Sequence, residues 1–193
     1  MKIISVATEN SVQEASKALL KAKVLVCPTD TVYGLLSDAT SKKAVGKVFK
    51  IKGRKEGKPL PIFVKDIAMA KTLAKVSFLQ EKYMKKVWPG KVTLVFKSRG
   101  VLPRETGTAE RIGLRIPRYW FVQAVLKEVK RPLTGTSANL AEKPSLFESK
   151  KVIAQFQNRK HKPDMVFDAG KLPYPRPSKV IDIMGTTPKI LRK

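Results

Sequence analysis

The chain has 193 residues, 42% of them hydrophobic, and its 40 Lys and Arg against 15 Asp and Glu give a net charge of +25. This length suits a single globular domain over residues 1–193, and the lack of any apolar run near ~20 residues excludes a membrane-spanning helix. Cys27 is the only cysteine, which excludes an internal disulfide and a cysteine-ligated metal cluster, and no secretory signal is evident, so we expect a cytoplasmic protein.

The N-terminal half alternates between predicted helices and strands. Ser11-Val12-Gln13-Glu14 is typical of a capping box and predicts a helix through about residue 21. An apolar run over 24–28 predicts a buried strand, and apolar residues at helical spacing predict a second helix over 41–51. A strand and two helices are then expected at 60–65, 66–75 and 77–87.

Predicted strands dominate the C-terminal half. Helices are expected at 118–129 and 149–157. The strands are expected at 92–97, 111–116, 132–136, 165–168, 179–184 and 188–192. Early alternation followed by crowded strands predicts an α/β fold with a mixed, twisted sheet and flanking helices. The chain has no Gly-x-Gly-x-x-Gly run, which argues against a dinucleotide-binding fold.

Polar residues follow the first buried strand in the segment Pro28-Thr29-Asp30-Thr31-Val32-Tyr33-Gly34-Leu35. Hydroxyl and carboxylate groups at the end of a rigid strand are well placed to hold a small ligand. The alternative is a capped turn that leads into the next helix, because Asp and Thr are ordinary turn residues.

A second polar cluster is Lys50-Ile51-Lys52-Gly53-Arg54-Lys55-Glu56-Gly57-Lys58-Pro59-Leu60. We interpret 52–59 as a flexible basic loop between a helix and a strand. Cations interspersed with glycines suit a polyphosphate, because Lys and Arg neutralise charge while Gly lets the backbone come close. The segment is not a P-loop, and a merely solvated charged loop is the alternative.

The two clusters, in this order and spacing, resemble the YrdC-like threonylcarbamoyl-AMP synthases. Other segments similar to family motifs follow in the same order: Trp88-Pro89-Gly90-Lys91-Val92-Thr93-Leu94, Gly113-Leu114-Arg115-Ile116-Pro117, Thr136-Ser137-Ala138-Asn139, Pro177-Ser178-Lys179-Val180-Ile181-Asp182 and Ile190-Leu191-Arg192. The resemblance covers about residues 20–192. It implies the single-domain form of the family, with an open, twisted mixed sheet and a large concave basic face.

Three departures from the family pattern stand out. Lys91 replaces the usual proline after Trp-Pro-Gly, and Lys179 replaces the usual threonine after Ser178. Ala141-Glu142 stands where many members have Ser-Gly. Lys179 matters most, because a hydroxyl near a phosphate becomes a long cation that either keeps the contact by charge or points elsewhere.

The resemblance implies a nucleotidyltransferase that forms threonylcarbamoyl-AMP and pyrophosphate from L-threonine, bicarbonate and ATP. This adenylate is the first product on the route to threonylcarbamoyladenosine in tRNA, which implies a downstream tRNA threonylcarbamoyl transferase complex as a partner. ATP is then a substrate, and Mg²⁺ is expected to arrive with it, held by phosphates and water. No metal bound tightly by protein ligands is expected.

The resemblance also implies residue roles. Lys52 and Arg54 are expected to be catalytic, neutralising the phosphates and the developing charge. ATP is expected to be bound by Lys52, Arg54, Lys58, Thr136, Ser137, Asn139 and Arg192. Threonine is expected to be bound by Thr29, Thr31, Tyr33, Arg115 and Ser178. Arg115 lies between apolar neighbours and requires a partner, either a substrate carboxylate or a structural acid such as Asp182.

The charge of +25 predicts a positive surface that attracts polyanions such as tRNA. Solubility, or adaptation to an unusual cytoplasm, would explain the same charge. The alternative function is therefore a non-catalytic RNA-binding module on the same fold. A carbamoyl-transfer relative from hydrogenase maturation is a third hypothesis, although no acylphosphatase or zinc-finger region accompanies the domain here.

Overall fold

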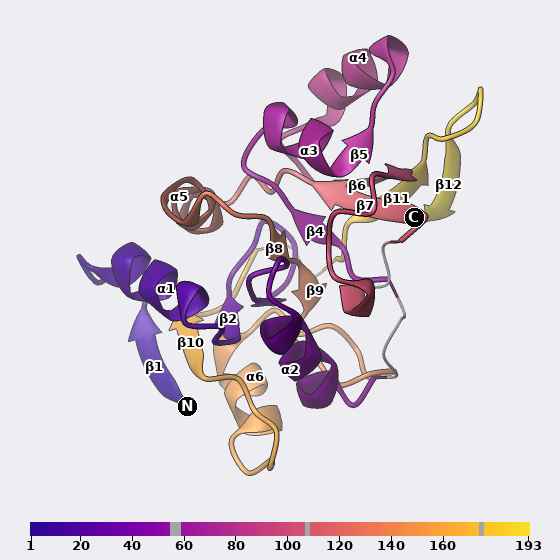
Figure 1. Cartoon of the computed structure of the whole chain (residues 1–193). Coiled ribbons are helices and arrows are strands. Elements are labelled where there is room, and N and C mark those ends of the chain that lie inside the picture. Colours follow the sequence, from indigo (N-terminus) through magenta and orange to yellow (C-terminus); the bar gives the residue numbers. More distant parts are fainter. Residues whose placement is uncertain (55–58, 107–108, 174–175) are drawn as a thin grey trace.

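The computed structural model describes residues 1–54, 59–106, 109–173 and 176–193, arranged as helices that flank two β-sheets (Figure 1). The α-helices of the described residues are α1 Ser11–Leu20, α2 Lys42–Lys52, α3 Ile67–Leu73, α4 Phe78–Val87, α5 Trp120–Val129 and α6 Ser149–Phe156, with one 3-10 turn at Arg104–Thr106.

The first sheet has five strands in the order β1-β10-β2-β3-β9. Its parallel part joins β1 to β10 and β10 to β2, and antiparallel pairing then adds β3 and β9. The strands are β1 Lys2–Ser5, β2 Leu25–Cys27, β3 Gly34–Leu36, β9 Thr136–Ser137 and β10 Met165–Asp168.

The second sheet has seven strands, six of them in the order β12-β11-β6-β7-β4-β8, with β5 pairing on β6. β11 runs parallel to β6 and β4 parallel to β7, while the other pairs are antiparallel. The strands are β4 Ile62–Phe63, β5 Ala74–Lys75, β6 Val92–Ser98, β7 Arg111–Arg115, β8 Leu133–Thr134, β11 Lys179–Asp182 and β12 Lys189–Arg192. The predicted α/β class with mixed pairing is thus confirmed, with the strands divided between two sheets.

Gly135 is the point at which the chain passes from one sheet to the other. The single strand predicted over 132–136 is wrong, because β8 pairs with β4 in the second sheet and β9 with β3 in the first. The Gly135 amide donates to the Pro61 carbonyl at 2.7 Å. A Cβ at Gly135 would lie 2.3 Å from the ring of Phe63, so only glycine lets the chain pass here without displacing that ring.

Three strands were not predicted, and one cap was predicted wrongly. The strands β1, β3 and β5 have two to four residues each, too short to show a clear period in the sequence. Ser11 does not cap α1: the N-cap is Asn10, and the buried Ser11 hydroxyl donates to the Val6 carbonyl at 2.9 Å. A capping box does form at α4, between Ser77 and Gln80.

Two apolar clusters hold the layers together. The smaller cluster lies where α1 packs against α5, and it includes the rings of Phe121 and Phe167 with centroids 5.0 Å apart. The larger cluster includes Tyr33, Phe49 and Phe96. Each is buried enough that removing a large side chain would leave a cavity.

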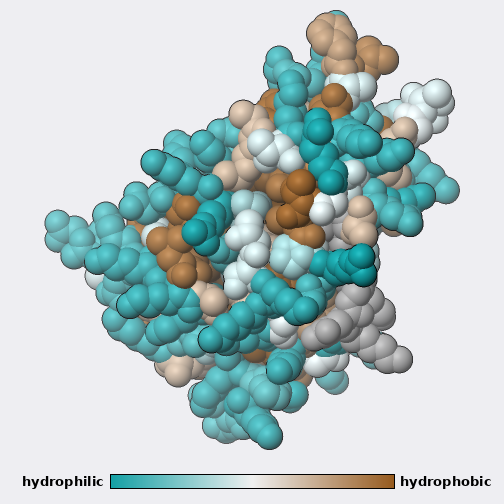
Figure 2. All heavy atoms as spheres, viewed as in Figure 1, coloured by the Kyte–Doolittle hydropathy of each residue, from teal (hydrophilic) through white to brown (hydrophobic). Residues whose placement is uncertain are grey.

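The surface in Figure 2 is mostly hydrophilic, with separate apolar patches. The most exposed large apolar side chains of the described residues are Phe78 and Leu79 at the start of α4, at 73% and 74%. None of the described helices is long and apolar enough to cross a membrane. The large concave basic face remains a prediction.

We expect Gly135→Ala to lower the free energy of unfolding by about 1–3 kcal/mol, because the new methyl group overlaps the buried Phe63 ring. Urea denaturation followed by circular dichroism measures the change.

Gly46→Ala is the matched control. Gly46 lies inside α2 and a Cβ there meets nothing within 4 Å, so alanine should stabilise the protein by about 0.5–1 kcal/mol. Equal effects of the two substitutions would contradict a steric requirement at Gly135.

Candidate active site

A cavity of about 410 Å³ opens where the two sheets meet. Its lining includes residues of the turn after β2, the end of α2, β6, β7 and the segment around β9. Among the described lining residues are four cations and a single acid, Lys52, Arg54, Arg115, Arg192 and Glu142. Such a wall favours an anionic ligand.

The turn after β2 forms one wall through two hydroxyl groups. Thr29 Oγ1 lies 2.9 Å from Thr31 Oγ1 and donates to the Val32 carbonyl at 2.7 Å. The Thr31 amide in turn donates to Thr29 Oγ1 at 3.1 Å. These bonds hold both threonines, each only 3% exposed, in one arrangement at the cavity.

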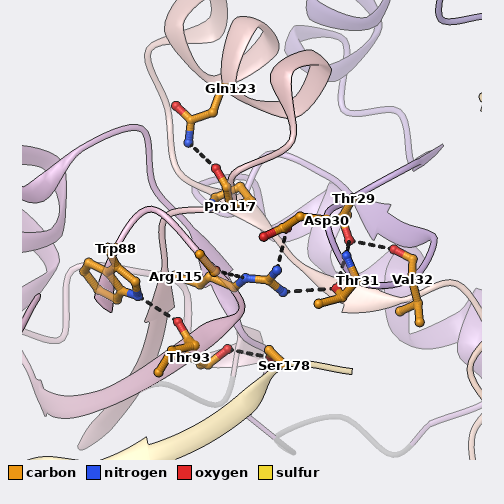
Figure 3. A network of polar contacts seen from close by, with 12 residues as sticks. Thr29, Asp30, Thr31, Val32, Trp88, Thr93, Arg115, Pro117, Gln123 and Ser178 are labelled. Atoms are coloured by element: carbon orange, nitrogen blue, oxygen red, sulfur yellow. Dashed lines mark hydrogen bonds and ion pairs between the residues drawn. The ribbon is translucent and has the colours of Figure 1, made fainter. Parts of the chain in front are cut away.

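Arg115 bridges the two sheets (Figure 3). From the end of β7 its Nη2 donates to Asp30 Oδ1 at 2.5 Å, and its Nη1 donates to Thr31 Oγ1 at 3.2 Å. Its Nε donates to the Gly90 carbonyl at 2.8 Å. Asp30 and Thr31 follow a strand of the first sheet, whereas Arg115 belongs to the second, so this network fixes the two walls of the cavity relative to each other.

The structural partner of Arg115 is Asp30 and not Asp182, the acid suggested from the sequence. Asp182 instead faces Arg111 at 3.5 Å. The Arg115 side chain is only 3% exposed, and this burial lowers its pKa, while the charge of Asp30 opposes that effect. Arg115 also lines the cavity, so the ion pair leaves it in a position to meet a substrate.

Lys52 is the last residue of α2 and not the first residue of a flexible loop. Its side chain enters the protein, where Nζ donates to the Ser137 carbonyl at 2.6 Å and to the Asn139 carbonyl at 2.8 Å. A longer bond of 3.3 Å reaches Asn139 Oδ1. The three protons of the ammonium group therefore have three protein acceptors, and what Lys52 offers to a ligand is its charge.

Burial changes the ionisation of both cations in this wall. It lowers the pKa of Lys52 to about 8, and the nearby charge of Arg54 lowers it further in the same direction. Burial also lowers the pKa of Arg54. Arg54 Nη2 lies 3.5 Å from the Pro59 carbonyl, and its guanidinium lines the cavity.

The segment after β9 forms the part of the wall that is bonded to Lys52. Thr136, Ser137 and Asn139 all line the cavity. The Asn139 amide group donates to the carbonyls of Leu140 and Lys143, so it holds the turn closed. Glu142 has φ of 65°, a conformation that glycine adopts freely, so glycine would fit this position of the turn without strain.

Ser178 and Arg192 form the last wall, together with Thr93 from β6. The Ser178 hydroxyl lies 3.0 Å from Thr93 Oγ1, and Arg192 donates to the Ser178 carbonyl through Nε at 3.0 Å and Nη2 at 2.8 Å. Burial lowers the pKa of Arg192. The neighbouring Lys179 is exposed and is not part of the cavity lining, so its side chain does not replace a hydroxyl there.

One predicted site residue of the described part of the chain, Tyr33, is not part of the cavity lining. Tyr33 was expected to line the cavity, which is wrong: it is fully buried, with its hydroxyl donating to the Gly170 carbonyl at 2.9 Å and accepting from the Ala169 amide at 3.0 Å. Burial raises the pKa of Tyr33 to about 12. Lys58 lies outside the described residues.

Several residues of the site were missed from the sequence. Thr93 and Phe63 line the cavity, and the guanidinium carbon of Arg115 lies 5.5 Å from the centre of the Phe63 ring. Asp30 was noted in its motif but not as the partner of Arg115. A signal existed for Thr93, because it is a polar residue inside the otherwise apolar run Val92-Thr93-Leu94-Val95-Phe96.

These features define an α/β ligand-binding domain whose cavity suits a substrate carrying phosphate or carboxylate groups. Hydroxyls gather at the Thr29 side, and Lys52, Arg54 and Arg192 supply positive charge around them. The cations are held by backbone carbonyls and by one carboxylate. The cavity is therefore preorganised for an anion before any ligand binds.

Comparison with known proteins agrees with this class. A family model described as Sua5/YciO/YrdC, telomere recombination, matches residues 17–193. A Methanocaldococcus jannaschii protein, provisionally named a threonylcarbamoyl-AMP synthase, is 36% identical over 168 residues, covering 86% of this chain and 77% of its own length. The threonylcarbamoyl-AMP synthase of Pyrococcus abyssi is 31% identical over 186 residues, 95% of this chain. The chain belongs to the Sua5/YciO/YrdC family.

Solved structures show the same fold. The crystal structure of P. abyssi Sua5 complexed with L-threonine matches with a TM-score of 0.92 and 30% identity, over 100% of this chain and 57% of that chain. Escherichia coli YciO matches with a TM-score of 0.86 at 23% identity, which supports the fold alone. The chain spans about half (54%) of the P. abyssi synthase sequence.

We expect Asp30→Ala to lower the free energy of unfolding by about 3–5 kcal/mol, because it leaves the guanidinium of Arg115 buried without its carboxylate. Chemical denaturation measures the loss. The double substitution Asp30→Ala and Arg115→Met should recover part of it, since no buried charge then remains.

Glu14→Ala is the control for this prediction. It removes the exposed Lys2–Glu14 pair at 2.6 Å, and a surface pair contributes at most about 1 kcal/mol. If Asp30→Ala and Glu14→Ala lowered the free energy of unfolding by similar amounts, the buried pair would stabilise the fold no more than an exposed pair does.

Proposed function

We propose that this chain is a threonylcarbamoyl-AMP synthase, a single domain over residues 1–193 that joins L-threonine, bicarbonate and ATP. One arrangement supports the proposal above all: the buried cations Lys52 and Arg115 lie in one cavity with the hydroxyls of Thr29, Thr31 and Ser178. Relatives with the same fold are named for this activity, and one of them is complexed with L-threonine.

Threonine is assigned to the wall made by Thr29, Thr31, Arg115 and Ser178. Arg115 would attract the carboxylate, since a guanidinium matches a carboxylate in shape and charge. The hydroxyls of Thr31 and Ser178 would bond the polar groups of the amino acid. Tyr33 follows Thr31 and Val32 in this segment, but it is fully buried and its hydroxyl bonds Ala169 and Gly170 instead of facing the cavity.

ATP is assigned to the wall made by Lys52, Arg54, Thr136, Ser137, Asn139 and Arg192, with Lys58 a further candidate outside the described residues. Lys52 and Arg54 are the catalytic residues of the proposal. Their charges stabilise the negative charge that develops on the phosphates, in a site from which much of the water is excluded.

The reaction needs little covalent chemistry from the protein. The threonine amine attacks the carbon of bicarbonate or carbon dioxide and forms a carbamate, with loss of water in the bicarbonate case. A carbamate oxygen then attacks the α-phosphorus of ATP in line, and the bond to the β-phosphate breaks to release pyrophosphate. The contribution of the protein is to position both substrates and to neutralise charge.

Further elements of the proposal concern partners. Mg²⁺ accompanies ATP and is held by its phosphates and water. The product is a reactive adenylate, so a cytoplasmic tRNA threonylcarbamoyl transferase would consume it. Direct contact of the basic surface with tRNA is consistent with the net charge of +25.

Pyrophosphate release by the purified protein tests the function. We expect release with ATP, threonine and bicarbonate together, and loss of release when threonine or bicarbonate is left out. Mass spectrometry of the quenched mixture should detect the threonylcarbamoyl adenylate. Release indifferent to threonine, or no release from folded protein, would reject the synthase and favour the non-catalytic RNA-binding module.

Lys52→Ala should reduce the rate by about 100- to 1,000-fold, as the loss of one preorganised charge typically does. Lys50→Ala is the matched control, because Lys50 lies on the same helix but is exposed and outside the cavity lining. If both variants lost the same fraction of the rate of pyrophosphate release, the effect would come from the net positive charge of the protein and not from the position of Lys52.

The value of kcat/KM for ATP should fall as the pH rises above about 8. The lowered pKa of Lys52, about 8, means that its ammonium is charged below this pH and neutral above it. Lys52→Arg should remove the decline, even if its activity is lower, because a guanidinium stays charged. Identical pH profiles for the wild-type protein and Lys52→Arg would contradict a role for the charge of Lys52.

A further inference from the structure

A second cavity, of about 670 Å³, lies on the other side of the turn after β2. The two cavities share Thr29 and Thr31, but Arg118, Tyr119 and Trp120 line only the second one. Its volume is within the range of small-molecule sites. None of the roles assigned above uses these three residues.

One end of this cavity is positive. Lys91 and Arg118, both exposed, line it together with the start of α5. No side chain caps the N-terminus of this ten-residue helix. Unsatisfied amides and the helix dipole at such an end favour a phosphate group. Lys91 stands where the family motif has proline, so this cation is a departure of this chain.

The same cavity has an aromatic wall. Trp120 is 55% exposed, and its ring stacks on that of Tyr119 with centroids 6.4 Å apart at 26°. A tryptophan of this exposure at the mouth of a cavity offers a flat face to a planar ligand. Stacking of nucleic-acid bases on such rings is common in single-strand binding sites.

Asp30 provides an unsatisfied acceptor in the lining. It is 10% exposed, and while Oδ1 accepts from Arg115, its buried Oδ2 has no hydrogen-bond partner among the described residues. A buried carboxylate oxygen without a partner is unfavourable. If the carboxylate turns toward the cavity when a ligand binds, an N–H group such as the exocyclic amine of a base would satisfy it.

We propose that this second cavity binds a nucleotide, with its phosphate at the start of α5 beside Arg118 and Lys91 and its base against Tyr119 and Trp120. The shared chemistry is a planar base that carries a phosphate. Its source is either a free mononucleotide or an unpaired nucleotide of single-stranded RNA. This site is separate from the ATP wall and does not depend on the proposed function.

Two arms of one experiment distinguish the sources. In the first arm, a fluorescein-labelled decamer of single-stranded oligoadenylate is titrated with protein and followed by anisotropy. In the second arm, AMP is titrated into Trp88→Phe, in which Trp120 is the only tryptophan, so that quenching reports the second cavity. Binding in either arm supports the site and identifies its source.

The double variant Arg118→Ala and Trp120→Ala should weaken oligoadenylate binding by about 5- to 100-fold, as expected for a lost stacking partner and phosphate contact. In the AMP arm, Arg118→Ala alone is introduced into Trp88→Phe, because it keeps the Trp120 signal, and it should weaken AMP binding. Arg159→Ala with Phe78→Ala is the matched control, since it removes one exposed cation and one exposed aromatic ring elsewhere. Equal losses in both double variants, or no binding in either arm, would overturn the proposal.

Pyrophosphate release is measured on the same variants. Because Arg118 and Trp120 are exposed and lie outside the first cavity, release should stay within about twofold of the wild-type rate. Loss of nucleotide binding with release retained would therefore identify a separate site. Arg118→Glu, a single exposed substitution, gives a second test in case the double variant does not fold.

Discussion

A buried guanidinium requires partners, and this requirement at Arg115 organises the cavity. The side chain leaves the second sheet and reaches Asp30 and Thr31, which follow a strand of the first. Breaking this contact would leave a charge in a dry interior, which costs far more than an exposed ion pair contributes. The two sheets are therefore fixed relative to each other beside the cavity, and Thr31 is held at the cavity by the same network.

Lys52 is likewise a buried cation that joins two segments of the cavity wall. Its ammonium group is anchored by the carbonyls of Ser137 and Asn139, so the end of α2 and the turn after β9 hold each other. Burial removes the Lys52 ammonium from water, and in this drier interior its charge would act more strongly on a phosphate in the cavity. The cost of that burial appears as the lowered pKa of Lys52. One side chain thus gives structural support and, in the proposed function, positive charge for the phosphates of ATP.

Much of the secondary structure was predicted from local patterns, because the spacing of apolar residues within one segment, such as α2 or β10, is enough to indicate a helix or a strand. They failed where a distant contact decides the outcome. The residues 132–136 look like one strand, yet Gly135 passes the Phe63 ring and the chain changes sheets. Ser11 fits a cap pattern, but its hydroxyl donates to the Val6 carbonyl, and Asn10 takes the N-cap position instead.

By itself the sequence determined the family, the mixed α/β class, and the cations and most of the hydroxyl residues that line the described cavity, because ordered motifs preserve the residue types that the chemistry requires. Only the tertiary structure decided which acid pairs with Arg115, that Lys52 is buried at a helix end, and that Tyr33 is buried outside the cavity lining. The reason is physical. A motif shows which side chains are present, whereas the partner, the burial and the orientation of each side chain depend on segments that are distant in the chain and meet only after folding.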